Sequence, residues 1–435
     1  MSETSFRIEG GHSLYGEVTA QHAKNAVLPM IAAALIPEQG ETILHEVPNL
    51  KDIHQAFDAL RHIGAKVTYD PATRIAQINA EQLNTGILPA EITTRFRGSV
   101  LLLAPLLLRL GYVELPGSGG CNIGLRKIDY HHRGFARLGA KVIYHEDGTT
   151  VIKQESKGLT GTLIYLDFPS HTGTENLMMG ASIAQGYTII ENASVEPEVL
   201  DFGNYLNQMG AKIEGLGTHT LYIEGVKKLQ PIEYTPMPDR LDTGTFLMAV
   251  SIAGGDVIIN NCRPDHLRLL NAKLEQMGIE IQVLDHATLR IKRDLNKTLN
   301  PINITTHPYP GFPTDLQPCM AALSTKTKGI SYIRETIFEN RYDFTDGLIS
   351  MGADILISQS DVCVITGVKQ LRGAHVKAES IRAGAAVLIA SLGANGTTII
   401  DNIYQIDRGH EYIEDRLNAL GADITRIEKI PSPSY

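Results

Sequence analysis

One short phrase recurs six times along the chain, and it constrains the possible fold more than any other feature of the sequence. In each copy a glycine follows an apolar residue and precedes alanine or isoleucine, a charged residue and a β-branched residue. Successive copies lie 68 to 75 residues apart. A near-constant period of this length indicates a repeated structural unit. The six glycines are Gly64, Gly139, Gly210, Gly278, Gly352 and Gly421.

A second phrase, a glycine followed by alternating apolar residues, begins 24 to 29 residues before each of these glycines. The alternation predicts a strand. Ahead of it we expect an apolar, alanine-rich helix, and between the two phrases an amphipathic helix, such as 199–209, that ends at the repeated glycine. The unit is therefore a buried helix, a strand, a surface helix and a further strand. The apolar helices are clearest at 24–35, 177–184, 245–253 and 383–392.

Six such units predict an α/β protein of two similar lobes, each built from three units around a shared centre. The strongly apolar helices require burial on all sides, so we expect them inside, with the sheets outside. The repeat is interrupted by a segment with three prolines at 227–240, which is typical of a linker between lobes. A cleft between two lobes is the usual place for a ligand.

Composition excludes several classes of protein. The chain has 435 residues, 43% of them hydrophobic, a net charge of −9 and no tryptophan, so we expect a globular protein with no nucleic-acid groove. Its four cysteines form no CxxC pair, which suits a reducing compartment. The N-terminus lacks the pattern of a signal peptide. The most apolar run, 100–110, is too short to span a bilayer, so we expect a cytoplasmic protein that does not enter a membrane.

Residues 115–131 form the most unusual stretch, which reads LPGSGGCNIGLRKIDYH. Its four glycines allow the backbone to approach a ligand closely or to move over one. Cys121 lies between them, and Arg126 and Lys127 follow within six residues. Bare amides and nearby cations favour a thiolate, which predicts a reactive cysteine. The alternative is that Cys121 is a small buried hydrophobic residue, as most intracellular cysteines are.

Several cations lie next to expected helix starts, although the chain is acidic overall. Lys24 and Asn25 begin the first apolar helix, and a lysine there is opposed to the helix dipole unless an anion lies between. Asp315 follows a proline-rich loop, where it is either a helix cap or a general base. Taken singly, each cation is more simply a solvated surface charge. Together they offer a site for a strongly anionic small molecule, and the arginines concerned are Arg97, Arg341, Arg382 and Arg408.

Several common signatures are absent from the sequence. It contains no complete GxGxxG, no P-loop and no HExxH. The pair His131 and His132 has no ligand set beside it, so we expect no metal. No Ser/His/Asp triad can be assembled, and no cofactor is expected.

The chain resembles the UDP-N-acetylglucosamine enolpyruvyl transferases and, more distantly, the 5-enolpyruvylshikimate-3-phosphate synthases. The resemblance covers about residues 6 to 428. It implies the two-domain inside-out α/β barrel of that family, with lobes at 24–233 and at 1–23 plus 234–435. The motifs that carry it are AKNAVLP, GGCNIGLR, IIENASVEPEVLDFGNYLNQMGAKI, PDRLDTGTFLMA, YPGFPTDLQ, ETIFENRY and IDRGHEYIEDRLNALGADI.

The resemblance also implies the reaction and its residues. The enolpyruvyl group of phosphoenolpyruvate would pass to the 3-hydroxyl of UDP-N-acetylglucosamine with release of phosphate, in peptidoglycan precursor synthesis. Cys121 corresponds to the general acid, and Asp315 to the group that takes the proton of the 3-hydroxyl. Lys24, Arg126 and Arg382 match residues that grip phosphoenolpyruvate. The remaining positions implied in substrate binding are Asn25, Arg97, Lys127, Ile128, Asp129, Tyr130, His131, Ser170, Ile337, Arg341 and Arg408.

The sequence departs from the family pattern at several of these places. SGAKNA becomes QHAKNA, the cysteine loop is longer by Ser118 and Gly119, and an aspartate is replaced by Ser380. A lysine is lost in the stretch 168–174, FPSHTGT. Two alternatives therefore stay open. One is a paralogue with a different nucleotide or sugar acceptor, and the other is a catalytically silent binding or regulatory protein.

Overall fold

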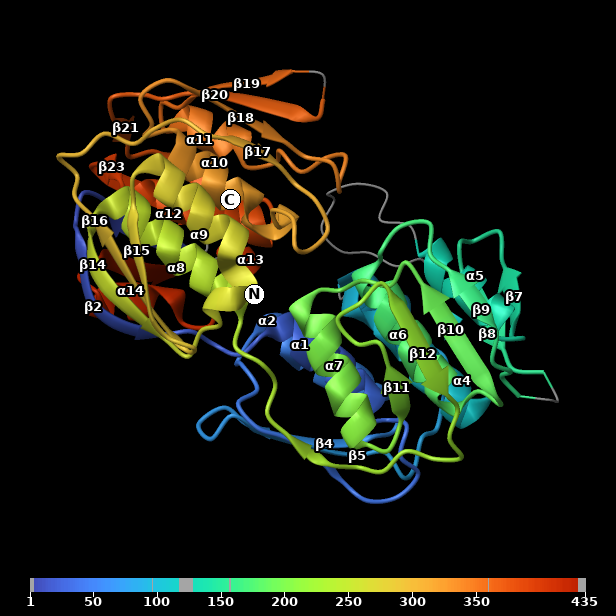
Figure 1. The fold of residues 1–435 in the computed structure, drawn as a ribbon. Helices are drawn as coiled ribbons and strands as arrows, with labels where there is room; N and C mark the ends of the chain where they lie inside the picture. Colours follow the sequence, from blue (N-terminus) through green and yellow to red (C-terminus); the bar gives the residue numbers. More distant parts are fainter. Residues whose placement is uncertain (1–3, 96, 117–127, 156–157, 359, 429–435) are drawn as a thin grey trace. The chain divides into compact units, whose positions relative to one another are not determined.

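The chain forms two compact units in a computed structural model that describes residues 4–95, 97–116, 128–155, 158–358 and 360–428 (Figure 1). The first unit runs from His22 to Met237. The second unit combines the N-terminal residues up to Gln21 with Pro238 onward. Each unit has its own continuous hydrophobic core. No helix in the described ranges has both the length and the apolar content needed to cross a bilayer.

Three sheets surround the core of the first unit, as far as the described residues show. In two of them the edge pair is parallel and the other pairs are antiparallel. The third has antiparallel pairs only, with an isolated parallel bridge from Ile87 to Glu114 at the same edge. In strand order they are β13(Glu233–Tyr234)-β3(Thr42–Leu44)-β5(Ile75–Asn79)-β4(Lys66–Asp70), β6(Tyr112–Leu115)-β8(Thr150–Lys153)-β7(Lys141–Tyr144) and β11(Lys212–Glu214)-β12(Thr220–Glu224)-β10(Tyr187–Glu191)-β9(Leu163–Tyr165).

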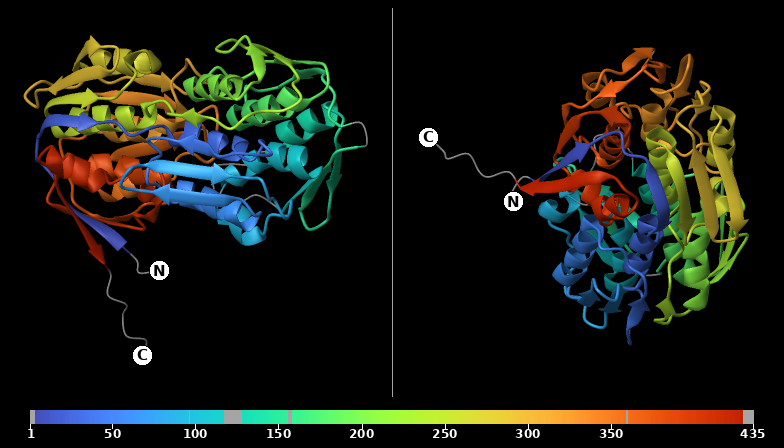
Figure 2. Two further views of the ribbon diagram at one scale, coloured as in Figure 1. Left: turned by 90° about the horizontal axis from the view of Figure 1, so that it is seen from below. Right: turned by 90° about the vertical axis from the view of Figure 1, so that its left-hand side faces the viewer.

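The second unit repeats this pattern three times, and the N-terminal strands complete two of its sheets. Strand β1(Thr4–Glu9) lies between β24(Thr397–Asp401) and β25(Asp423–Glu428) and is antiparallel to both, so the first and last described strands lie side by side (Figure 2). A short parallel pair, β21(Leu371–Arg372) and β23(Ala394–Asn395), lies apart. The sheets are β15(Glu280–Asp285)-β16(Thr288–Arg293)-β14(Gly255–Asn260)-β2(Leu14–Thr19), β17(Asn303–Thr305)-β18(Ile330–Arg334)-β20(Val362–Thr366)-β19(Asp354–Ser358) and β22(His375–Lys377)-β24(Thr397–Asp401)-β1(Thr4–Glu9)-β25(Asp423–Glu428).

The apolar helices lie at the centre of each unit and the sheets lie outside them, which confirms the predicted inside-out arrangement. Every residue of α8(Arg240–Ala253), α10(Gln317–Ser324) and α12(Ile381–Leu392) is buried. The apolar run at 100–110 is split into a 3₁₀ segment and an α-helix, with Pro105 in the first turn of the latter. The central helices are α1(Lys24–Ala33), η1(Arg97–Leu102) with α4(Leu103–Leu110), α6(His171–Ile183), α8(Arg240–Ala253), α10(Gln317–Ser324) and α12(Ile381–Leu392).

An outer helix precedes each of the six repeated glycines, as the phrase predicts. All six glycines have φ between 91° and 104°, a conformation that glycine adopts without a steric penalty. The glycine thus ends the outer helix and turns the chain into the next strand. The outer helices are α2(Lys51–His62), α5(Asp129–Arg137), α7(Pro197–Gln208), α9(Arg268–Met277), α11(Thr345–Ser350) and α14(Ile413–Ala419). The short elements α3(Ala90–Arg95), η2(Pro264–Leu267), η3(Thr314–Leu316) and α13(Tyr404–Asp407) complete the described chain.

Candidate active site

The second unit brings together Asp315, Arg341 and Arg382. Asp315 lies in η3, directly after the proline-rich loop, and Arg382 is the second residue of α12. Arg341 Nη2 lies 2.7 Å from Asp315 Oδ1, and Arg382 Nη2 lies 2.9 Å from Asp315 Oδ2. One carboxylate therefore holds two guanidinium groups that come from different repeats.

Both arginines of this cluster are buried, whereas the carboxylate between them is 27% exposed. Burial disfavours the Asp315 carboxylate, but Arg382 and Arg341 outweigh it and hold its pKa well below the usual range. Burial also disfavours the Arg382 guanidinium, but Asp315 and Asp239 outweigh it and raise its pKa. The cluster carries one net positive charge, which suits an anionic ligand.

The simpler alternatives for these residues are wrong. Asp315 does not cap α10, whose N-cap residue is Leu316 with no side-chain cap. Arg341 and Arg382 are 3% and 8% exposed, so neither is a solvated surface charge. Arg408 is also buried, and its Nη1 donates to Gln405 Oε1 at 2.9 Å.

Glu335 shapes the loop that carries Ile337. Its carboxylate accepts hydrogen bonds from the backbone amides of Ile337 and Phe338, at 2.8 and 3.2 Å. The hydroxyls of Thr306 and Thr314 donate to the same carboxylate. Thr314 belongs to the segment that carries Asp315, so Glu335 fixes both loops against each other.

Asp343 is a member of this neighbourhood that the sequence reasoning missed. Its Oδ1 atom is buried and has no hydrogen-bond partner among the residues that the structure describes. Burial raises the pKa of the Asp343 carboxyl, while the Ser380 hydroxyl and the Arg341 guanidinium act in the opposite direction. Ser380 also caps α12, because its Oγ accepts from the amide of Ala383. The sequence feature that could have pointed to Asp343 is its position two residues after the predicted site residue Arg341.

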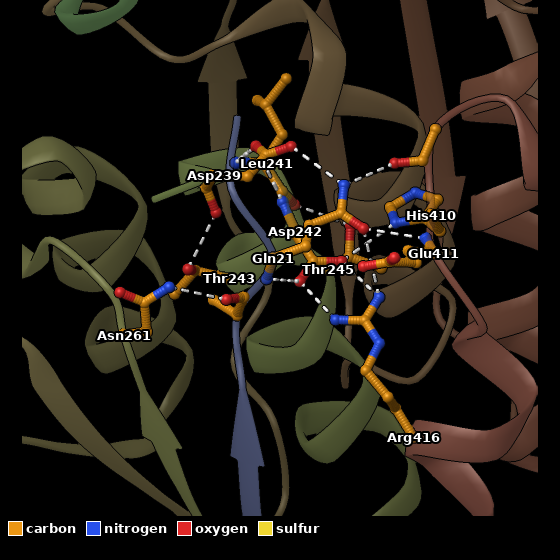
Figure 3. A network of polar contacts seen from close by, with 12 residues as sticks. Gln21, Asp239, Leu241, Asp242, Thr243, Thr245, Asn261, His410, Glu411 and Arg416 are labelled. Atoms are coloured by element: carbon orange, nitrogen blue, oxygen red, sulfur yellow. Dashed lines mark hydrogen bonds and ion pairs between the residues drawn. The ribbon is translucent and has the colours of Figure 1, made fainter. Parts of the chain in front are cut away.

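A buried polar network surrounds Gln21, the last residue of the second unit before the chain enters the first (Figure 3). Asp242 lies inside it, where Arg416 Nη1 and Nη2 donate to its two carboxylate oxygens at 2.7 and 2.9 Å. Burial disfavours the Asp242 carboxylate, but Arg416 outweighs it and lowers its pKa. His410 Nδ1 lies 3.3 Å from Asp242 Oδ1. No motif in the sequence predicted this network.

In the first unit, Lys24 is the first residue of α1 and is only 7% exposed. Its Nζ lies 3.0 Å from Oδ2 of Asp52, which is also buried, in the first turn of α2. The alternative of a solvated lysine is therefore wrong. Asn25 follows Lys24 in α1 and is half-buried.

His131 is neutral and held in one orientation. It lies in α5, where Asn176 Nδ2 donates to its Nδ1 at 2.9 Å, and Thr172 Oγ1 lies 3.5 Å from its Nε2. Burial, with His132 and Arg97 nearby, lowers the pKa of His131 to about 3. The Nε2 atom therefore carries the proton.

The other predicted positions of this region lie around the starts of α5, α6 and η1. Ser170 caps α6, because its Oγ accepts from the Gly173 amide at 3.2 Å. Arg133 ties the first turn of α5 together, since it pairs with Asp129 and lies over the Tyr130 ring. Ile128 directly precedes α5, and Arg97 begins η1. Cys121, Arg126 and Lys127 lie outside the described residues.

His171, which directly follows Ser170, is held between two carboxylates. Its Nε2 lies 3.2 Å from Glu175 Oε1 and its Nδ1 lies 3.3 Å from Glu196 Oε2. Burial disfavours the imidazolium, but Glu175 and Glu196 outweigh it and raise the pKa of His171 to about 10. His171 is therefore a cation at neutral pH. Among the described residues, no group of three or more His, Cys, Asp or Glu side chains is arranged to hold a metal ion.

Comparison with known proteins identifies the family. A family model described as EPSP synthase (3-phosphoshikimate 1-carboxyvinyltransferase) matches residues 8–417. The chain belongs to this family of enolpyruvyl transferases. Among curated relatives, the UDP-N-acetylglucosamine 1-carboxyvinyltransferase of Thermobifida fusca is 47% identical over 98% of this chain and 99% of its own length. UDP-N-acetylglucosamine 1-carboxyvinyltransferase 1 of Caldanaerobacter subterraneus subsp. tengcongensis is 43% identical over 98% and 100%.

Solved enolpyruvyl transferase structures share the fold. NikO, the enolpyruvyl transferase of Streptomyces tendae, is 25% identical, with a TM-score of 0.87 over 99% of this chain and 100% of its own. EPSP synthase from Acinetobacter baumannii is 18% identical, with a TM-score of 0.75 over 98% and 100%, which speaks for the fold alone. The family, its chemistry and the inside-out fold expected from the sequence are thereby confirmed.

Proposed function

We propose that this enolpyruvyl transferase moves the enolpyruvyl group of phosphoenolpyruvate to the 3-hydroxyl of UDP-N-acetylglucosamine and releases phosphate, in peptidoglycan precursor synthesis. The observation that carries the proposal is the Asp315 carboxylate clasped by Arg341 and Arg382, in a chain up to 47% identical to relatives named for this substrate. Both substrates are small molecules. We further propose that the protein works in the cytoplasm and does not enter a membrane.

The proposed reaction has two steps. In the addition step, Asp315 takes the proton of the 3-hydroxyl, the sugar oxygen bonds to C2 of phosphoenolpyruvate, and Cys121 gives a proton to C3. In the elimination step, the C2–O bond to phosphate breaks, C3 returns a proton to the Cys121 thiolate, which restores the double bond, and Asp315 gives its proton to the released phosphate. The proposed cations, Lys24, Arg126 and Arg382, stabilise the phosphate and the carboxylate through both steps.

The geometry makes Asp315 a weak base until substrate arrives. Two guanidinium groups hold its carboxylate in the ionised form, and such a carboxylate takes up protons poorly. An anionic substrate that engages Arg382 would give this arginine a second partner and weaken its hold on Asp315. The basicity of Asp315 would then rise only in the loaded site, where the 3-hydroxyl is to be deprotonated.

The test is phosphate release from phosphoenolpyruvate with and without UDP-N-acetylglucosamine. We expect release only with the nucleotide sugar. Asp315→Asn keeps the shape but removes the base, and we expect kcat to fall by about 10² or more. Asp346→Asn, at an exposed position in α11, serves as the matched control with unchanged rates. Release with a different nucleotide sugar alone would favour a paralogue, and no release with any acceptor would favour a silent binding protein.

A further inference from the structure

Gln21 is the centre of the polar network described above, and both the nitrogen and the oxygen of its carboxamide form hydrogen bonds. Nε2 donates to the carbonyl oxygen of Gly409 at 3.0 Å, and Oε1 accepts from the backbone amide of Glu411 at 2.8 Å. The side chain thus binds the backbone on either side of His410. Figure 3 shows Gln21 among Asp242, His410, Glu411 and Arg416.

The main chain of Gln21 is held as firmly as its side chain. Its amide donates to Asp242 Oδ2 at 3.1 Å, and its carbonyl accepts from the amide of Asp239 at 2.8 Å. Nε2 also lies 3.3 Å from Asp239 Oδ2. Gln21 is 3% exposed, so water cannot replace these partners without cost.

The backbone segment that Gln21 binds lies against Arg382 of the candidate site. A Cβ atom built on Gly409 would lie 2.5 Å from Ile381 Cγ2 and 3.8 Å from Arg382 Nη1. The Gly409 backbone therefore packs on the start of α12, and a side chain would not fit there. Arg408 is the preceding residue, and its backbone is part of the same turn.

Asp239 contacts Gln21 and also interacts electrostatically with the Arg382 guanidinium. It caps α8, since its Oδ1 accepts from the amides of Leu241 and Asp242, and it is one of the two carboxylates that keep Arg382 charged. Gln21 donates to the other oxygen, Oδ2. The two partners of Gln21 Nε2, the Gly409 carbonyl and the Asp239 carboxylate, therefore both lie next to Arg382 in space or in charge.

We propose that Gln21 is a positioning residue of the transferase site, which fixes the backbone at Gly409 and the carboxylate of Asp239 so that Arg382 is aligned for phosphoenolpyruvate. The inference rests on the proposed function of Arg382. It gives a role to the QHAKNA departure, because the serine of the usual SGAKNA phrase is too short to bind Gly409 and Glu411 together. Gln21 itself touches no substrate in this account.

The test compares Gln21→Met with Gln370→Met in the full-length protein. Methionine keeps the volume of glutamine and removes its hydrogen bonds. Gln370 is the matched control, because its Nε2 donates to Gly393, at the opposite end of α12, and its Oε1 accepts from Lys326. We expect Gln21→Met to raise KM for phosphoenolpyruvate about tenfold. Gln370→Met should leave KM unchanged and lower the melting temperature by a smaller amount, because Gln370 is half-buried.

Gln21→Glu supplies a pH signature that a purely structural role would not. As an anion, the new side chain cannot donate to Gly409 and lies beside Asp239 and Asp242. When protonated, it regains one donor. We therefore expect kcat/KM of Gln21→Glu, relative to wild type, to recover as pH falls, whereas the Gln21→Met ratio stays constant.

The inference is overturned if Gln21→Met and Gln370→Met have equal KM values for phosphoenolpyruvate. It is also overturned if Gln21→Met lowers the melting temperature but leaves KM unchanged. A wild-type protein that does not turn over UDP-N-acetylglucosamine would instead contradict the proposed function. The dissociation constant of phosphoenolpyruvate, measured by calorimetry without acceptor, then decides the role of Gln21. Weaker binding by Gln21→Met supports it, and equal binding, or no binding by wild type, overturns it.

Discussion

At the scale of single residues, the half-buried carboxyl of Asp343 lowers the stability of the folded protein near the candidate site. Its raised pKa means that the folded state binds this proton more tightly than the unfolded chain does. Stability is therefore lost as pH rises above the ordinary aspartate range, and the loss persists at neutral pH. The physical origin of that loss is the burial of the carboxyl, whose Oδ1 atom has no hydrogen-bond partner in the described part of the chain.

Asp343→Asn should therefore stabilise the protein. We expect a gain of about 1 kcal/mol in the free energy of unfolding at pH 7, and no gain near pH 3, where both states carry the proton. Urea unfolding at the two pH values measures the difference. A variant that is less stable than wild type at pH 7 would show that the ionised carboxylate has a stabilising partner.

His171 has the opposite pH dependence. Its pKa is raised to about 10 in the folded state, so its contribution is complete below the unfolded value and is lost as pH rises through 10. We expect His171→Gln to cost about 3 kcal/mol at pH 7 and clearly less at pH 10. His145→Gln, at an exposed position, is the control. An equal cost at both pH values would contradict a cationic His171.

At the scale of elements, substitutions at the repeated glycines allow the free-energy cost of backbone strain to be measured apart from that of side-chain packing. Gly210 has φ of 104°, and a Cβ atom added there meets no atom of the described residues within 4 Å. Gly210→Ala should therefore cost about 1 kcal/mol through backbone strain alone. Gly210→Asn should cost less, since asparagine tolerates positive φ better. Equal losses for the two variants in urea unfolding would point to a cause other than φ.

The repeat also explains how much of the elements the sequence predicts. A glycine at positive φ and an apolar helix each depend on residues close together in the chain. Their periodic recurrence can therefore be read directly from the sequence, and it predicts the six units. The partners of Asp315 are not local, because Arg341 and Arg382 come from other parts of the chain and only packing brings them together. The same holds for Gln21, whose partners lie about 220 and 390 residues further along the chain.

At the scale of the whole molecule, the second unit depends on the N-terminal strand. Phe6 is fully buried in β1, pairs with Ile400 and Arg426 on its two neighbouring strands, and has the Arg426 guanidinium over its ring. Phe6→Ala should cost about 3–5 kcal/mol. Arg7→Ala, an exposed neighbour, should change stability by less than about 0.5 kcal/mol.

Calorimetric unfolding of both variants measures this difference. Because each unit has its own core, we expect the loss in Phe6→Ala to fall on the second unit. Equal stability of the two variants would contradict the structural role of β1.

The central claim is that this chain joins an enolpyruvyl group to the 3-hydroxyl of UDP-N-acetylglucosamine. The most direct measurement is mass spectrometry of the nucleotide sugar after incubation with phosphoenolpyruvate and the full-length protein. The account predicts a product heavier by one enolpyruvyl group, formed in equal amount to released phosphate and greatly reduced in Asp315→Asn. An unmodified UDP-N-acetylglucosamine, with or without phosphate release, would contradict it.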